Sequence, residues 1–419
     1  MRIHFTRQKQ LWMILFTIIT PFLFISSRSS SNKTEDNPAT IDLQKLIQNT
    51  QVVPLSRFVT SLEYIPLEYK QECPTSGPRV FVTNDFIFMR SGDGTLLLFD
   101  RKTGKFIRPI GKRGRGPEEY LRLLDCFYNP YDQKIYANAV NSVNTYNLKG
   151  EFIESFAKLK VKEPTIKDGY INASIEAFLP GDKYICYISN FNGAINKRIA
   201  IMTKNNELKS FPHFEKWSDP KNQYVPISQS PRFFSFGENV SFKEFSNDTI
   251  FYVTMEKLIP RLVLFSGELK HPYILTSKEA VDQFTKPKDY LYTLNIFENA
   301  KYLFFDLISK NKPIENKPTA FKLIRNLCIY DKENRSTVAC KADEEDNSRL
   351  IDDINNFMPI LPYLITENNE MVAILEAAEI VKWKAQNPNI AAKLITKLPW
   401  LDKIDELDNP VIVFGKCKN

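Results

Sequence analysis

One short segment, IGKRGRGPEEY at residues 110–120, concentrates residue types that bind phosphate. Its glycines and cations are Gly111, Lys112, Arg113, Gly114, Arg115 and Gly116. Only 14 of the 419 residues are glycine, so the cluster needs a local reason. A P-loop requires G-x-x-x-x-G-K-[ST], and a dinucleotide loop requires G-x-G-x-x-G. The spacing here is G-x-x-G-x-G, and Arg113 stands where a hydroxyl would follow Lys112. The segment therefore does not indicate a nucleotide site.

Two interpretations of this segment remain open. In the first, it is a sharp turn in which one or more glycines adopt positive φ, so that Gly116→Ala destabilises the protein. The residues expected to shape the turn are Gly111, Gly114, Gly116, Pro117 and Tyr120. Arg113 or Arg115 then forms weak surface ion pairs with Glu118 or Glu119. In the second interpretation, Arg113 and Arg115 bind an anionic ligand.

Linear motifs for catalysis are missing from the sequence. The three histidines, at positions 4, 213 and 271, form no H-E-x-x-H, and there is no G-x-S-x-G. Four aspartates recur in similar turn-forming contexts: Asp85, Asp132, Asp182 and Asp248. Oxygen ligands of this kind bind calcium, but aspartate is also common in any β-turn. We expect no catalytic residue, metal site or cofactor. The alternative is a metal-dependent propeller hydrolase or lyase with acidic residues at the channel mouth, for which calcium is one metal that fits.

Aromatic side chains gather in the irregular stretch 213–236, where Trp217 and Tyr224 are candidate contacts for a sugar or peptide. Their alternative role is to pack the loop against the fold. The six cysteines include no C-x-x-C pair, which excludes common zinc and redox motifs. Cys328 and Cys340 are placed symmetrically in a predicted hairpin, and we expect two buried thiols rather than a disulfide.

The N-terminus predicts export. Basic residues precede a 15-residue apolar run at 11–25, which is short for a membrane span. We expect a signal peptide at 1–29, or else an uncleaved anchor, followed by a polar tether at 30–55 and a location in the periplasm or at the cell surface. The net charge of +7 is spread along the chain, which argues against nucleic acid. The expected partner is a small molecule, glycan or protein bound by a monomer.

A turn followed by an apolar strand recurs along the chain. Clear copies lie at 83–89, 131–137, 180–188 and 246–253, and weaker ones at 298–307 and 367–375. Glycine- or asparagine-containing hairpins follow at 97–111, 144–156 and 327–340. Six such units predict an all-β, six-bladed propeller over 56–419, with a helical insertion at about 376–398. A seven-bladed ring or two β-sandwiches are the alternatives. Lone strands at 61–69 and 409–418 are expected to close the ring in the last blade.

The segments FDRKTGKFIRPIGKRGRGPEEY, YDQKIYA and YNLKGEFI resemble the exported six-bladed propellers of Bacteroidetes, which are related in style to NHL-type propellers. The resemblance extends from about Val59 to the C-terminus. It implies an extracytoplasmic propeller of unsettled activity, and therefore a non-catalytic binding or interaction module. Such proteins are mostly lipoproteins with a cysteine after the signal peptide, whereas here the first cysteine is Cys73. We therefore expect no lipid.

Overall fold

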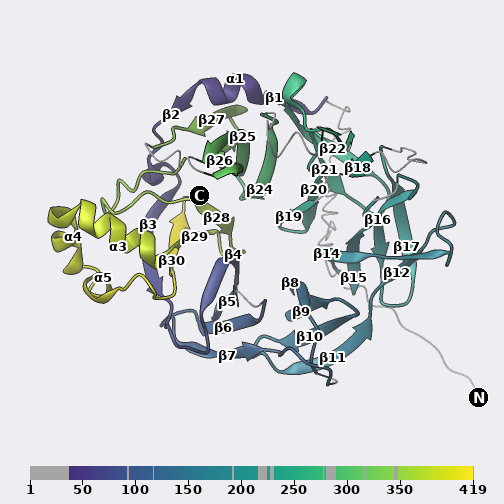
Figure 1. Ribbon diagram of the computed structural model, residues 1–419, viewed down its shortest axis with the longest axis horizontal. Coiled ribbons are helices and arrows are strands. Elements are labelled where there is room, and N and C mark those ends of the chain that lie inside the picture. Colours follow the sequence, from purple (N-terminus) through teal and green to yellow (C-terminus); the bar gives the residue numbers. More distant parts are fainter. Residues whose placement is uncertain are drawn as a thin grey trace, which may run out of the picture. The chain divides into compact units, whose positions relative to one another are not determined.

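The computed structural model describes residues 37–418 except 92–93, 117, 191–192, 216–223, 227–230, 277, 280–288, 315–316 and 344–347. Side chains at 76–79, 224–226 and 310–323 are likewise not described. The predicted signal peptide at 1–29 thus lies outside the described residues. Residues 38–419 form a single unit, in which six β-sheets are arranged around a central axis (Figure 1). The predicted six-bladed propeller is confirmed.

Each blade contains a four-stranded antiparallel sheet whose first strand is nearest the axis (Figure 1). Blade 1 comprises β4 (Thr75–Val82), β5 (Phe86–Ser91), β6 (Leu96–Asp100) and β7 (Phe106–Ile110). Blade 2 comprises β8 (Leu123–Asn129), β9 (Lys134–Ala139), β10 (Ser142–Asn147) and β11 (Phe152–Ala157). Blade 3 comprises β14 (Ser174–Leu179), β15 (Lys183–Tyr187), β16 (Lys197–Met202) and β17 (Glu207–Pro212).

The later blades follow the same order. Blade 4 comprises β19 (Arg232–Phe236), β20 (Asn239–Lys243), β21 (Thr249–Val253) and β22 (Leu258–Phe265). Blade 5 comprises β24 (Tyr292–Glu298), β25 (Tyr302–Ile314), β26 (Lys317–Asp331) and β27 (Ser336–Cys340). Blade 6 comprises β28 (Pro362–Ile365), β29 (Glu370–Leu375), β30 (Val411–Cys417) and β3 (Val59–Pro66). Two short pairs lie outside the blades: β12 (Lys160–Lys162) with β13 (Tyr170–Asn172), and β18 (Tyr224–Pro226) with β23 (Ile274–Thr276).

The middle strands are mostly buried because both faces of a blade contact a neighbour. In β5, Ile87 and Met89 pack in a cluster with blade 6, whereas Phe88 packs with residues of blade 2 such as Ile135. Successive side chains of a strand point to opposite faces, so each blade supplies alternate residues to the two neighbouring interfaces. The core is therefore a ring of inter-blade clusters.

The two ends of the chain close the ring in blade 6, as the sequence predicted. The N-terminal strand β3 pairs with the C-terminal strand β30, with Tyr64 opposite Val413. Arg101 of blade 1 reinforces this closure, because its side chain is only 9% exposed and pairs with Glu63 at 3.0 Å and Glu370 at 3.2 Å. It also lies 3.2 Å from the ring centroid of Phe414.

The predicted tether at 30–55 is wrong for its second half. Strand β1 (Ala39–Asp42) adds in parallel to the outer strand of blade 4, and β2 (Thr50–Gln51) adds in parallel to that of blade 5. Helix α1 (Leu43–Gln48) joins them, and its Leu43 and Leu46 are buried. A one-turn 3-10 helix, η1 (Leu55–Arg57), leads into β3. The segment is ordered in spite of its polar composition. Its two strands cover the exposed edges of two sheets, and a few apolar residues between them are buried.

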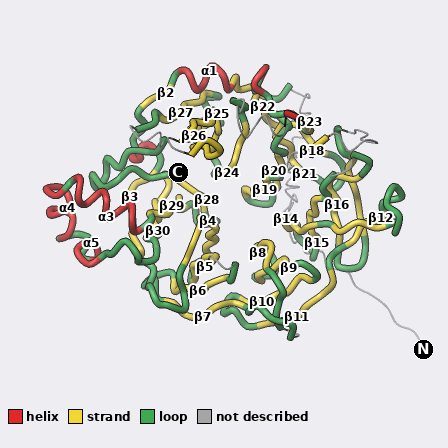
Figure 2. Tube along the Cα trace, in the orientation of Figure 1, coloured by secondary structure: helices red, strands yellow, loops and turns green. Residues whose placement is uncertain are grey.

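Helices lie on the outer side of the ring (Figure 2). The predicted insertion near 376–398 consists of α3 (Ala377–Gln386) and α4 (Pro388–Ile395), and the short α5 (Trp400–Lys403) extends it toward β30. Ile380, Leu394 and Leu401 anchor these helices in the cluster between blades 5 and 6. A second 3-10 helix, η2 (Gly267–Leu269), follows blade 4.

All six cysteines are free. Cys328 pairs across the hairpin with Ala339, so Cys340 lies one residue out of register and faces the opposite side of blade 5. The two thiols accordingly belong to different hydrophobic clusters. The expected buried thiols are confirmed.

Candidate functional site

A cavity of about 1500 Å³ occupies the centre of the propeller. Every blade contributes to it through its inner strand or the turn that follows, for example Phe81, Tyr128, Phe178, Phe234, Asn295 and Tyr363. The inner strand of each blade has no further strand on its axial side. Residues of the six inner strands can therefore line a central cavity. A cavity of this size accommodates a small molecule or a peptide segment.

The lining of the cavity is acidic although the chain as a whole is basic. Its carboxylates are Asp85, Asp125, Glu176, Glu298, Asp306, Glu367, Glu370, Glu376 and Glu379. Its guanidinium groups are Arg232, Arg325 and Arg349. No histidine lines the cavity within the part of the chain that the structure describes. The cavity thus combines hydrogen-bonding groups, charges of both signs and aromatic walls.

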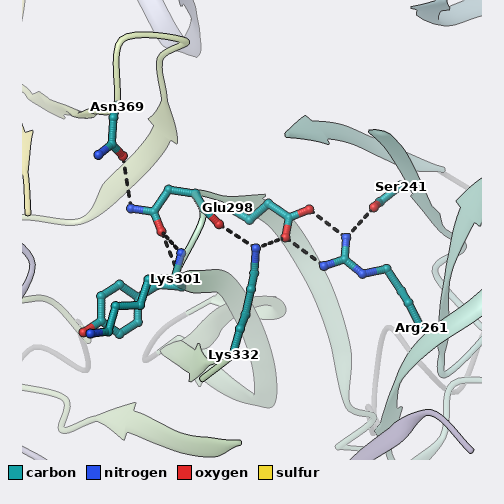
Figure 3. A network of polar contacts seen from close by, with 8 residues as sticks. Ser241, Arg261, Glu298, Lys301, Lys332 and Asn369 are labelled. Atoms are coloured by element: carbon teal, nitrogen blue, oxygen red, sulfur yellow. Dashed lines mark hydrogen bonds and ion pairs between the residues drawn. The ribbon is translucent and has the colours of Figure 1, made fainter. Parts of the chain in front are cut away.

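Glu298 is the centre of a buried ionic network that joins blades 4 and 5 (Figure 3). Arg261 of β22 binds its carboxylate with both terminal nitrogens, at 2.7 and 2.8 Å, and also donates to the Ser241 hydroxyl at 2.6 Å. Lys332 forms a second ion pair with Glu298 and donates to the carbonyl of Asn299 at 2.5 Å. Burial alone would raise the pKa of Glu298, but the two cations hold it below its ordinary value.

The same network continues into blade 6. The side-chain amide of Asn299 donates to the Oδ1 of Asn369 at 3.2 Å, and its own Oδ1 accepts the backbone N–H groups of Lys301 and Tyr302 (Figure 3). Both asparagines lie in turns that line the cavity. The network therefore fixes the positions of the turns at this end of the cavity.

Two exposed aromatic residues, Tyr131 of blade 2 and Phe236 of blade 4, line the same end of the cavity. Partial burial raises the pKa of the Tyr131 hydroxyl, and Glu238 and Glu367 raise it further. Carboxylates from blades 4 and 6 therefore both act on a side chain of blade 2 at this end of the cavity.

A different arrangement is found between blades 5 and 6, where Asp306 lines the cavity. The residue is 5% exposed, and its Oδ1 atom is buried without a hydrogen-bond partner in the described residues. Burial raises the pKa of Asp306 to about 6, while the nearby Arg325 acts in the opposite direction. Arg325 also lines the cavity, yet no ion pair connects it to Asp306 among the described contacts.

The four predicted turn aspartates do not converge. Asp132 accepts hydrogen bonds from the Lys134 N–H and the Tyr136 hydroxyl, and Asp248 accepts them from Ser266. Asp182 occupies a left-handed turn position with φ of 53°, and of the four only Asp85 lines the cavity. Within the described residues, no three acidic, histidine or cysteine side chains are placed to hold a metal ion. Turn geometry accounts for the recurrence of these residues.

The glycine-rich segment 110–120 is the crossover from β7 to β8, between blades 1 and 2. Gly111 has φ of +65°, whereas Gly114 and Gly116 do not adopt positive φ, so the expectation placed on Gly116 is corrected to Gly111. Tyr120 is buried beneath the loop, and its hydroxyl donates to the carbonyl of Ile110 at 3.4 Å.

Glu119 organises the rest of this loop. Its carboxylate accepts the Gly116 N–H at 2.8 Å and pairs with Lys112 at 2.9 Å. These contacts hold the pKa of Glu119 below its ordinary value. Arg113 and Arg115 are exposed, form no ion pair among the described contacts, and do not line the cavity. Binding of an anion by these two residues stays a prediction.

The remaining predicted residues cannot be placed in the site. Trp217 and Pro117 lie outside the described residues. Tyr224 begins the short strand β18, with its backbone opposite Thr276, and its side chain is not described. The residues that sequence reasoning missed, Asp306 and Arg325, interrupt the apolar runs YLFFDLI and FKLIRNLCIY. A charge inside a strand that is buried on both faces is the signal that could have identified them.

No helix in the described part of the chain is both long and apolar enough to cross a membrane.

Comparison with solved structures supports the propeller architecture. A protein described as a candidate exported protein of Bacteroides fragilis is 16% identical, with a TM-score of 0.59 over 91% of this chain and 99% of that one. A DUF4221 family member from Bacteroides vulgatus is 11% identical, with a TM-score of 0.54 over 86% of this chain and 97% of that one. The search of curated proteins gave no match. The family described as a domain of unknown function, DUF4934, matches residues 38–416, which is the propeller with its N-terminal strands; the chain therefore belongs to the DUF4934 family.

Proposed function

We propose that the protein is a non-catalytic, extracytoplasmic binding protein whose ligand occupies the central cavity. The observation that carries this proposal is the cavity of about 1500 Å³ lined by all six blades, with polar and aromatic side chains on the inner strands and the turns that follow them. Sites of this kind combine apolar walls with a few positioned polar groups. The ring closure and the Glu298 network hold those groups in place before a ligand arrives, which lowers the entropic cost of binding.

Filling the cavity is expected to abolish binding. Ser235 is an exposed residue of the inner strand β19 that lines the cavity, so Ser235→Trp inserts a large side chain without disturbing a packed core. The matched control is Ser336→Trp, which places the same side chain at an exposed position of β27, away from the cavity. Native mass spectrometry of each protein, after incubation with the small-molecule fraction of spent culture medium, gives the readout.

The wild type and Ser336→Trp should retain a compound that Ser235→Trp does not. Equal retention by all three proteins, or no retained mass in the wild type, would contradict the proposal. Conversion of the compound on incubation would instead support a hydrolase or lyase, the second candidate for this cavity.

Export of the protein, and kinship with NHL-type propellers, belong to the same proposal. The similar solved structures include a candidate exported protein, which is compatible with the apolar N-terminal run. Protein purified from its native host should lack roughly the first 29 residues, following the usual anatomy of signal peptides. Its intact mass should show no lipid, since no cysteine lies near the cleavage region. A retained Met1 or a diacylglycerol adduct would count against this prediction.

A further inference from the structure

We propose that Asp306 and Arg325 form a subsite for a zwitterionic small molecule of the amino-acid class, with its ammonium group at Asp306 and its carboxylate at Arg325. The inference rests on the proposed binding function of the cavity and specifies what the cavity binds. It concerns the part of the lining that lies between blades 5 and 6.

The first step is the position of the two side chains. Asp306 of β25 pairs with Leu327 of β26, and Arg325 lies two residues from Leu327 on the same strand. Asp306 and Arg325 are therefore diagonal neighbours on one face of the blade, and such side chains start about 7–8 Å apart. Phe304 and Leu327 share this face and pack in the cluster with blade 6. Both charged groups thus point toward the interface with blade 6, where the cavity lies.

The second step is the lack of partners. Asp306 forms no hydrogen bond or ion pair among the described contacts, and its Oδ1 is buried without a partner although the residue lines a cavity. A buried carboxylate without partners is costly to keep, so a protein that only needed packing here would favour an apolar residue. Arg325 likewise forms no ion pair among the described contacts. Two opposite charges thus lie close together without pairing, and one ligand that carries both charges can satisfy them at once.

The third step is the surroundings of the pair. The other charged residues of this part of the lining are Arg349, Glu376 and Glu379, and Arg349 already pairs with Glu379 at 3.0 Å. Leu361, Pro362 and Leu375 line the same region. Apolar contacts of this kind suit an aliphatic side chain on the ligand, whereas a purely anionic ligand would be repelled by Asp306 and Glu376.

The test uses L-leucine, leucinamide and N-acetylleucine as probes, measured by isothermal titration calorimetry at pH 7.5. Leucinamide keeps the ammonium group and loses the charge of the carboxylate. N-acetylleucine keeps the carboxylate and loses the charge of the ammonium group. The full-length mature protein is compared with Asp306→Asn, Arg325→Gln and the control Asp402→Asn. Asp402 is exposed on α5, outside the cavity lining. Thermal unfolding of each variant shows whether it is folded, and Asp306→Asn should melt no lower than the wild type because it removes a buried, unpaired charge.

Leucine should bind the wild type and Asp402→Asn equally, and both derivatives should bind about tenfold more weakly or worse, since each loses a charge-assisted contact. Asp306→Asn and Arg325→Gln should each weaken the binding of leucine to a similar degree. The inference is overturned if leucine does not bind, if the derivatives bind as well as leucine, or if the two variants bind like the wild type. If, in that case, the wild type and Ser336→Trp still retain a compound that Ser235→Trp does not, only the subsite is wrong and the cavity remains the binding site.

Discussion

Glu298→Gln is expected to lower the free energy of unfolding by about 3–5 kcal/mol, because it leaves the partly buried cations Arg261 and Lys332 without their buried counter-charge. The Glu298 side chain is 2% exposed, and it is the acidic partner of both cations. Urea unfolding at pH 7.5 measures the change directly. The network joins blades 4 and 5, so the loss should appear in the cooperative unfolding of the whole ring.

The matched control is Glu333→Gln, which breaks an exposed pair with Lys301 in the same blade. Exposed pairs contribute little, so this variant should unfold like the wild type.

The stabilisation that Glu298 contributes should depend on pH with a definite sign. The folded-state pKa of Glu298 is lowered, so its contribution is present above the unfolded-state pKa and is lost as the pH falls through the folded-state pKa. The difference between wild type and Glu298→Gln should therefore shrink on acidification. Equal stability at pH 7.5 would show that the network is not essential.

Gly111→Ala is expected to destabilise the protein by about 2–4 kcal/mol, from the cost of a Cβ at positive φ and from overpacking. Its φ is +65°, and a Cβ at this position would lie 2.4 Å from the Tyr146 hydroxyl oxygen and 2.7 Å from Cε1 of Tyr120. Both rings are buried in the cluster between blades 1 and 2. The crossover must therefore move if a side chain is introduced. Both the midpoint temperature of thermal unfolding and the midpoint urea concentration should decrease.

Gly116→Ala is the control within the same loop. Gly116 does not adopt positive φ, and its added Cβ would meet the Glu119 side chain at 3.1 Å, which can shift. We expect a loss below about 1 kcal/mol, in the range of ordinary surface substitutions. If Gly116→Ala proves as damaging as Gly111→Ala, then the turn depends on the whole cluster of glycines and not on the one residue at positive φ.

The blades could be predicted from the sequence because their signals are local. Segments such as TNDFIFM and NTYNLKGEFI each encode a turn and a strand within about ten residues, and the closing strands stand out as unpaired apolar runs. The N-terminal strands β1 and β2 could not be found in this way. Their partners β22 and β27 are more than 200 residues away, and parallel addition to an existing edge leaves no turn signal between the paired strands.

The candidate site was less predictable for a related reason. Aspartates such as Asp132 recur in the sequence and so are candidate metal ligands, but they recur because aspartate suits the geometry of these turns. Asp306 and Arg325 occur once each, and their proximity depends on the register of β25 against β26. Conversely, the exposed Arg113 and Arg115 are conspicuous in the sequence but lie outside the cavity lining. Sites formed across a ring depend on contacts between blades, which single-sequence patterns do not encode.

The most direct test of the central claim is a crystal structure of the wild-type protein grown with the compound it retains from culture medium. The account predicts difference density within the central cavity, in contact with inner strands of more than one blade and absent from Ser235→Trp crystals grown in the same way. Density on the outer surface of the ring, for instance at the Arg113–Arg115 loop, with an empty cavity, would contradict it.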